Sequence, residues 1–219
     1  MTNPTSEEPD APEPGGSPPG RRLTARGAAT RDRIVAAAAD LMYVKGVNAT
    51  ALDDIRAATG TSKSQLYAHF PDRDALVHEV ISLRGRQVLE RETQRLGRLS
   101  SFSGLIRWRN ALIEVNSLQN GAHGCALGAM ANELADQDEQ ARVSLAGLFL
   151  AWEELLAAGL RRMQDKGTLR LDADPDRLSV GLMAALQGGY LLASTAHDVR
   201  PMEIALDLAL SHIKSYLTE

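Results

Sequence analysis

The chain has 219 residues, enough for one good-sized domain or two small ones, and 44% of them are hydrophobic while only 4% are aromatic. Its single cysteine, Cys125, excludes an intramolecular disulfide, and neither a signal peptide nor an apolar run of bilayer length is found, which predicts a soluble, cytoplasmic protein without a membrane partner. The net charge of −4 is unevenly spread: residues 1–20 hold four acidic and no basic side chains, whereas residues 21–86 hold 11 Lys and Arg against 7 Asp and Glu.

The first residues lack any sign of regular structure. Residues 1–20 are rich in Pro, Gly, Ser and acids and have no apolar periodicity, so we expect residues 1–25 to form a disordered tail. Three arginines, Arg21, Arg22 and Arg26, follow just before the first expected helix. They predict a basic arm, which either contacts DNA or serves as a solvated linker.

Short helices are predicted over residues 26–72. Thr30 is the expected N-cap of the first helix, and Gly46 its C-terminal cap. Thr50 and Asp53 have the spacing of a capping box that would start a second helix, which Gly60 would end. Because segment 62–70 follows this break, the region has the layout of a helix-turn-helix DNA-binding domain.

Segment 62–70 has the pattern of a recognition helix. Leu66 and Phe70 lie four residues apart, so on a helix they share one buried face. The side chains left to point outward are Lys63, Ser64, Gln65, Tyr67 and His69. A compact set of donors and acceptors with one cation is typical of a helix that enters the major groove.

The roles of these side chains follow from their chemistry. Lys63 and Gln65 are the expected base readers, the first toward guanine and the second toward adenine. Tyr67, Thr50 and His69 suit phosphate oxygens, which fix the register on the duplex rather than read its sequence. For His69, capping the end of the recognition helix is an equally good alternative.

The remainder, residues 73–219, is predicted to be helical throughout, which gives an all-α fold. Asp72 after Pro71 begins a fourth, connecting helix that runs past Val88, and Asp174 followed by Pro175 is a strong start signal for a later one. The other helices are expected at about 103–119, 126–135, 138–164 and 201–217.

Several residues of this second part have the composition of a small-molecule site, in which apolar walls carry a few polar groups. The candidates are Trp108, Asn116, Cys125, Met130, Glu133, Phe149, Trp152, Gln187 and Tyr190. Each has plain core packing as its alternative. Cys125 has a further alternative, the sensing of oxidants, since the neighbouring His123 would lower the pKa of the thiol.

Enzymatic and metal-binding motifs are missing from the sequence. The five histidines are scattered, and neither H-E-x-x-H nor E-x-x-H occurs. No nucleophile elbow, phosphate-binding glycine loop or dinucleotide fingerprint is present either. The sequence therefore predicts no enzyme, no metal and no cofactor.

The amino-terminal part resembles the tetracycline-repressor (TetR) family. The similarity rests on the run Ile34–Ala38, on Gly46, Thr50, Ile55, Ala58 and Gly60, and on Ser62, Leu66, Tyr67, His69, Phe70 and Leu76. It implies a three-helix DNA-binding head, a fourth connecting helix and a helical ligand-binding body. It also implies DNA contacts by Thr50, Thr61, Ser62, Lys63, Ser64, Gln65, Tyr67 and His69, with Arg73 at a phosphate-contacting position.

A homodimer is expected on two grounds. One short recognition helix reads only a few base pairs, so a specific palindromic operator requires two copies. Small residues, namely Gly181, Ala184, Ala185, Gly188 and Gly189, keep part of the penultimate helix thin, and the resemblance also places the dimer interface on the last two helices. The alternative is packing within one chain.

The resulting hypothesis is a homodimeric repressor that binds double-stranded DNA and is released by a small-molecule effector. An activator would have the same sequence features. A rival of another class is a small-molecule-binding or catalytic helical protein whose head is only structural. The exposed set of Lys63, Gln65 and Tyr67 beside a basic arm favours DNA binding.

Overall fold

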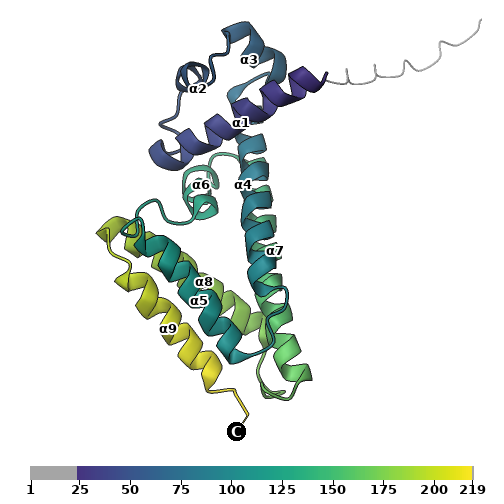
Figure 1. Cartoon of the computed structure of the whole chain (residues 1–219), viewed down its shortest axis with the longest axis vertical. Coiled ribbons are helices and arrows are strands. Elements are labelled where there is room, and N and C mark those ends of the chain that lie inside the picture. The colour runs from purple at the N-terminus through teal and green to yellow at the C-terminus, as the bar shows by residue number, and fades with distance from the viewer. Residues whose placement is uncertain (1–23, 219) are drawn as a thin grey trace, which may run out of the picture.

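A computed structural model describes residues 24–218, and over this range it is built from helices (Figure 1). Three of them form a compact head at one end: α1 (Ala25–Lys45), α2 (Leu52–Thr59) and α3 (Lys63–His69). The long α4 (Arg73–Leu96) runs from the head along the rest of the molecule. Since α1 packs on both α2 and α4, the head is attached to the body through the start of α4.

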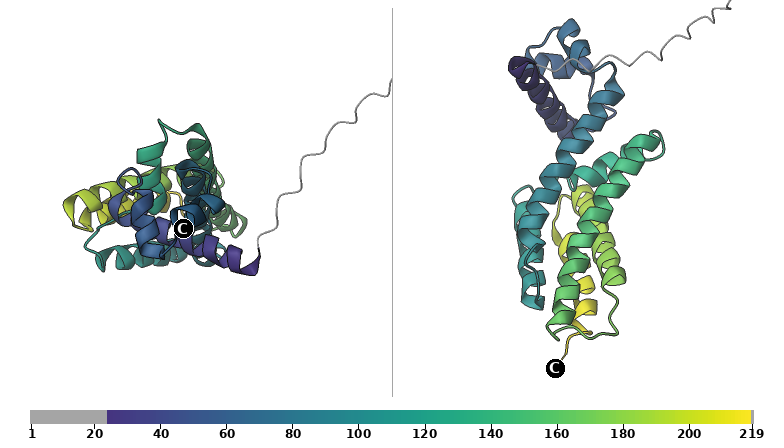
Figure 2. Two further views of the ribbon diagram at one scale, coloured as in Figure 1. Left: turned by 90° about the horizontal axis from the view of Figure 1, so that it is seen from above. Right: turned by 90° about the vertical axis from the view of Figure 1, so that its right-hand side faces the viewer.

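The body consists of α5 (Phe102–Ser117), α6 (Ala126–Leu134), α7 (Glu139–Asp165), α8 (Pro175–Ala196) and α9 (Arg200–Lys214). Helix α7 packs on α4 and α8, and α8 packs on α9, so the body is a layered helical bundle below the head (Figure 2). Within residues 24–218 no strand forms, apart from an isolated bridge between Leu169 and Leu217. The predicted all-α fold is therefore confirmed.

Most of the predicted helix ends are confirmed, because helix caps depend on residues that are neighbours in the sequence. Gly46 and Gly60 have φ angles of 93° and 65° where α1 and α2 end, which a residue with a Cβ rarely adopts. The Asp72 side chain caps α4 by accepting from the Ala75 amide, and Asp174 caps α8 ahead of Pro175.

Two predicted starts are wrong. Helix α1 begins six residues earlier than expected, with Thr24 as N-cap accepting from the Gly27 amide, whereas Thr30 lies within the helix and donates to the Arg26 carbonyl. At α2 the cap is made by Asp54, whose carboxylate accepts from the Ala51 amide, and not by Thr50 and Asp53.

The predicted tail and arm lie mostly outside the described residues, which begin at Thr24. Of the three arginines assigned to the arm, only Arg26 is described. It belongs to the first turn of α1 and is exposed. It therefore extends from a helix rather than from a linker.

Helices α7 and α8 are 27 and 22 residues long and reach mean hydropathies of 1.5 and 1.2 over 18 residues, so by length and composition each could cross a membrane. This differs from the prediction that no apolar run is long enough. Their apolar side chains nevertheless pack into the body: Leu145, Trp152 and Leu156 of α7 and Leu182 and Leu186 of α8 are each at most 2% exposed. We interpret both as core helices, which pass the same test.

Candidate DNA-binding surface and ligand pocket

Helix α3 is held by its own side chains. The Ser62 hydroxyl accepts from the Gln65 amide at 3.2 Å, and the Gln65 Oε1 accepts from the Ser62 amide at 2.8 Å. This reciprocal pair is a capping box, which satisfies two donors at the helix start. Leu66 and Phe70 are each 1% exposed, so the predicted inner face is confirmed.

The outer face of α3 carries the expected polar groups. Lys63, Ser64 and Tyr67 are exposed, and the Lys63 ammonium lies 6.0 Å from the centre of the Tyr67 ring. Gln65 is exposed too, but its carbonyl oxygen is already used by the capping box. A carbonyl oxygen has two lone pairs, so the capping box limits the orientation of Gln65 without excluding its predicted contact with adenine.

Two residues assigned to DNA lie inside the head instead. Thr50 is 1% exposed and its hydroxyl donates to the Gly46 carbonyl at 2.7 Å. Thr61 is 5% exposed and its hydroxyl bonds to that of Thr59 at 2.8 Å. Both hydroxyls thus hold the turns around α2 and are withdrawn from any partner surface.

Two further candidates of the head, Arg73 and His69, differ in whether their side chains are hydrogen-bonded within the chain. The Arg73 guanidinium donates to the Val47 carbonyl, so it braces the start of α4 against the turn after α1. His69 is half-buried beside Phe70, and its Nδ1 finds no hydrogen-bond partner among the described residues. Capping of α3 by His69 is therefore not seen at that nitrogen.

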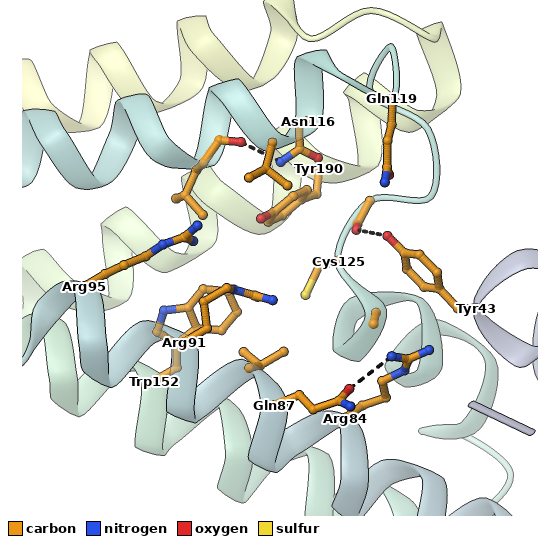
Figure 3. A pocket seen from close by; sticks show the side chains of 15 residues that line it. Tyr43, Arg84, Gln87, Arg91, Arg95, Asn116, Gln119, Cys125, Trp152 and Tyr190 are labelled. Atoms are coloured by element: carbon orange, nitrogen blue, oxygen red, sulfur yellow. Dashed lines mark hydrogen bonds between the residues drawn. The ribbon is translucent and has the colours of Figure 1, made fainter. Parts of the chain in front are cut away.

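A cavity of about 230 Å³ lies where head and body meet, and we call it the junction pocket (Figure 3). Its walls come from α1, α4, α5, the segment between α5 and α6, the start of α6, α7 and α8. Its lining residues are Tyr43, Arg84, Gln87, Val88, Arg91, Arg95, Leu112, Val115, Asn116, Gln119, Gly124, Cys125, Ala126, Trp152 and Tyr190. It thus borders the head directly, because Tyr43 belongs to α1.

Tyr43 ties this pocket to the head by two contacts. Its hydroxyl donates to the Gly124 carbonyl at 3.3 Å, and its ring lies 5.6 Å from the Arg84 guanidinium carbon. Arg84 in turn donates to Gln87 at 3.0 Å and to the Asp40 carboxylate of α1 at 2.8 Å. The pocket wall is thus connected to α1 through neighbouring side chains.

A buried carboxylate stands behind the pocket wall. Glu92 is 0% exposed, and its Oε1 accepts from Arg91 at 3.1 Å and from Arg95 at 3.0 Å. Its Oε2 accepts from the Trp108 indole at 2.9 Å. A buried charge needs such partners, since an unpaired one is costly.

A second cavity of about 460 Å³ adjoins the first and shares Gly124, Cys125 and Tyr190 with it. Phe149 and Gln187 line its walls together with His123, Gly128 and Asn132. The two cavities are therefore neighbours, with Gly124, Cys125 and Tyr190 between them, and both are candidate sites for a ligand.

The predicted ligand residues are thereby divided. Asn116, Cys125, Trp152 and Tyr190 line the junction pocket, and Phe149 and Gln187 line its neighbour. Trp108, Met130 and Glu133 line neither: the Trp108 indole serves Glu92, while the other two border a crevice of about 10 Å³. For these three the packing alternative fits the structure better, because aromatic and polar residues at helical spacing have core roles as well.

The cationic wall of the pocket was missed. Arg84, Gln87, Arg91 and Arg95 recur every three or four residues, so they share one face of α4. That spacing was available in the sequence as a signal. Without the fold, however, a run of arginines on a helix reads equally well as a solvated face.

Glu133 has a structural role that the sequence did not predict. Its Oε1 accepts from the Val47 amide at 2.9 Å and its Oε2 from the Asn48 amide at 2.7 Å. These amides belong to the turn that follows α1 in the head, whereas Glu133 belongs to α6 of the body. One carboxylate thus holds the two parts together; we call this contact the Glu133 link.

Burial determines the protonation state of two side chains that line the junction pocket, Cys125 and Tyr190. Burial raises the pKa of the Cys125 thiol, so the thiol stays protonated and a poor nucleophile at neutral pH. His123 lies against Tyr43, with 5.3 Å between ring centres. This geometry favours the packing alternative for Cys125. Burial likewise raises the pKa of Tyr190, which leaves its hydroxyl as a neutral donor.

Two family models match the chain. The model for bacterial regulatory proteins of the tetR family matches residues 34–80, which cover most of the head and the start of α4. The model for the tetracyclin repressor-like C-terminal domain matches residues 108–209, which cover most of the body. The two matches follow the order head then body that the structure shows.

Relatives cover nearly the whole chain. An uncharacterized HTH-type transcriptional regulator of Mycobacterium tuberculosis is 28% identical over 187 residues, 80% of this chain and 89% of the relative. The HTH-type transcriptional repressor DhaR of Mycobacterium sp. (strain GP1) is 26% identical over 188 residues, 79% and 86% of the two chains.

Solved structures share the fold. A TetR transcriptional regulator from Chloroflexus aurantiacus superimposes with a TM-score of 0.77 and 27% identity, over 89% of this chain and 98% of the other. The regulatory protein TetR from Rhodobacter sphaeroides gives a TM-score of 0.75 at 20% identity, over 84% and 98%. With its helix-turn-helix head and helical body, this chain belongs to the TetR family of DNA-binding transcriptional regulators, which are not enzymes.

Proposed function

We propose that this regulator is a cytoplasmic homodimeric repressor that binds a palindromic operator and is released when a small molecule fills its body. The observation that carries the proposal is the exposed polar face of α3, with Lys63, Ser64 and Tyr67 outward and Leu66 and Phe70 inward. A helix presented in this way suits the major groove. The relative DhaR is a repressor by name, which supports repression over activation.

An unpartnered apolar surface on the last two helices supports the dimer. Val180, Leu191 and Leu192 of α8 and Ile204 and Leu208 of α9 are 52–67% exposed, and we call this surface the α8–α9 outer face. So many exposed large apolar residues on one pair of helices are unusual for a monomer. A second copy would bury them.

Small residues on the same face would let two copies approach closely. A Cβ added at Gly181 or Gly188 meets nothing within 4 Å, and Ala184 between them is exposed. Gly189 faces the other way, since a Cβ there would lie 2.9 Å from the Met202 Cα. The predicted small residues thus serve two contacts, one within the chain and one outside it.

Release follows if the effector changes the position of the head. The junction pocket is bordered by α4, which carries the head, and by Tyr43 of α1. An effector that binds better when the two heads have the wrong spacing shifts the population away from DNA binding. Losing simultaneous contact with both half-sites lowers the affinity steeply.

The test is selection of bound sequences from random duplex DNA at a fixed salt concentration. We expect a palindromic motif with half-sites about 34–36 Å apart or at a related helical spacing. Lys63→Ala removes one contact from each copy of the dimer, so it should lower affinity for that motif about 30-fold or more and relax sequence preference at one base pair of each half-site. Lys214→Ala, which removes an exposed cation at the end of α9, is the matched charge control.

Unchanged sequence preference in Lys63→Ala would contradict the assignment of α3. Weak, salt-sensitive binding without a motif would instead favour the rival, a small-molecule-binding protein whose head is only structural. Sedimentation of the protein before DNA is added tests the dimer separately.

A further inference from the structure

The cationic wall of the junction pocket indicates what the pocket binds. Arg84, Arg91 and Arg95 all come from one face of α4, and none of the 15 lining residues is acidic. Figure 3 shows the side chains of Arg91 and Arg95 beside Trp152, Tyr190 and Cys125. Most of the wall is therefore either apolar or positively charged.

The balance between carboxylates and guanidinium groups around the pocket indicates the net charge that a ligand should carry. The Asp40 carboxylate pairs with Arg84, and the buried Glu92 carboxylate is shared by Arg91 and Arg95. Two carboxylates against three guanidinium groups leave one positive charge uncompensated within this group. A single negative charge on a ligand would neutralise it, whereas a dianion would exceed it.

Donors for that charge are in place. Arg91 uses only Nε on Glu92, and Arg95 only Nη1, so their other guanidinium nitrogens have no partner among the described residues. The Trp152 indole N–H is also without an acceptor there, although the residue is 1% exposed. A buried donor without an acceptor is costly, and a ligand oxygen would relieve that cost.

Each guanidinium group is anchored by a carboxylate, although the three differ in exposure. The side chains of Arg84 and Arg95 are 19% and 23% exposed, whereas that of Arg91 is 47% exposed. The planar fork of an arginine matches two oxygens of a carboxylate at once. Val88 between them on α4, and Leu112 and Val115 on α5, add apolar side chains to the lining.

We propose that the effector is a small organic monoanion, an apolar or aromatic body that carries one carboxylate, bound by Arg91 and Arg95 in the junction pocket. This inference rests on the proposed function, since it names the effector class for that same site. It also supplies the coupling, because the side chains that hold the ligand's charge belong to α4, the helix that carries the head.

The test compares matched acids and amides on the full-length protein. Benzoate and hexanoate, benzamide and hexanamide, and phenyl phosphate are titrated against the protein without DNA. The change in tryptophan fluorescence is followed, because Trp152 lines the pocket and Trp108 lies on Glu92. We expect at least one acid to bind about tenfold or more tightly than its amide and than phenyl phosphate.

Variants locate the site. Arg91→Gln or Arg95→Gln should each weaken binding of the acid about 10- to 100-fold, and each leaves Glu92 one arginine. Arg86→Gln, which removes an exposed cation of α4 outside the pocket, should leave affinity unchanged. Glu92→Gln keeps an acceptor for Trp108 but removes the competing charge, so it should tighten binding of the acid.

Equal binding of acids and amides, tighter binding of phenyl phosphate, or no binding of any acid overturns the inference. So does an Arg91→Gln effect no larger than that of Arg86→Gln. Release of operator DNA is measured separately. If an acid binds through Arg91 without releasing DNA, the anion site stands and the proposed effector function fails. If amides release DNA as well as acids do, the proposed effector function stands and the anion site fails.

Discussion

The head and the body satisfy their polar groups in different ways. In the head, the side-chain bonds of Thr50, Asp54 and Gln65 reach partners only three or four residues away. In the body, Trp108 reaches Glu92 across 16 residues, and Arg109 reaches Asp207 across 98. The head is therefore a locally determined unit, whereas the body depends on contacts between distant segments.

Few polar contacts join these two parts, and this makes control of the head possible. They include the Glu133 link, the Tyr43 hydroxyl on the Gly124 carbonyl, and the ion pairs Arg84–Asp40 and Arg31–Glu79. Under the proposed function, an effector in the body would act on the head through these contacts without unfolding it.

The largest effect is expected from the substitution Phe70→Ala, which tests whether head and body unfold separately. Phe70 is 1% exposed at the end of α3, and a Phe-to-Ala change in a core costs about 3–5 kcal/mol. Because Phe70 packs at the head end of the hydrophobic core that continues into the body, we expect the head to unfold at lower temperature while the body remains folded. Amide exchange read residue by residue should show lost protection in α1–α3 and retained protection in α7 and α8.

Leu156→Ala is the matched control in the body, where this residue is 0% exposed. It should lower stability by about 2–5 kcal/mol and release protection throughout α5–α9. Simultaneous loss of protection in head and body after Phe70→Ala would show that the two parts unfold as one unit, contrary to the comparison.

The next largest effect is expected at the Glu133 link. Glu133→Ala removes a carboxylate that accepts from the Val47 and Asn48 amides, and bonds to charged groups contribute about 1.5–3 kcal/mol each. Exchange of these two amides should speed up by an order of magnitude or more, and operator affinity should depend less on the ligand. Asp136→Ala, an exposed acid one turn away, is the control. Unchanged exchange at Val47 would remove the link from the coupling route.

The same contrast explains what the sequence could predict. Gly46, Gly60 and the Asp174–Pro175 start were predicted correctly because a cap depends on neighbouring residues only. The buried pair Leu66 and Phe70 follows from helical spacing in the same way. These local rules are enough to define the fold class and the orientation of α3.

Sites assembled from distant segments were not predictable in this way. Tyr43 and Arg91 line one pocket, yet nothing along the chain places α1 beside the middle of α4. Thr50 was assigned to DNA because a polar side chain in a helix-turn-helix has the same appearance whether it holds a turn or faces a partner. Only its burial and its observed hydrogen bond separate the two roles.

Within the body, the adjacent Gly188 and Gly189 test whether α8 packs inside the chain on one face and against a second copy on the other. Gly189→Ala puts a Cβ 2.9 Å from the Met202 Cα, so α8 and α9 must separate, and overpacking costs about 1–3 kcal/mol. Gly188→Ala meets nothing within the chain and should stabilise the monomer by up to about 1 kcal/mol through helix propensity. Thermal unfolding gives the first effect, and sedimentation shows whether Gly188→Ala weakens the dimer.

Equal destabilisation of the monomer by both alanines would mean that Gly188 also packs inside the chain. The α8–α9 outer face would then lose its small central residues as a contact between copies. Ile204→Glu provides an independent check, since this side chain is 60% exposed and a charge there should prevent dimerisation without unfolding the monomer.

The smallest effect is a pH dependence at the cap of α7. The Asp138 carboxylate accepts from the Ala141 amide and lies 2.7 Å from His78 of α4, and these contacts, the amide first, hold the pKa of that carboxyl below its usual value. A lowered folded-state pKa stabilises the fold above the unfolded value of about 3.9, and this contribution is lost as the pH falls through the folded pKa.

Asp138→Asn keeps an acceptor but cannot ionise, so it should cost less than about 1 kcal/mol at pH 7. Denaturant unfolding of both proteins between pH 7 and pH 3 should show that difference shrinking below about pH 4. A difference that persists at low pH would mean that the amide contact alone, and not the charge, stabilises this junction between α4 and α7.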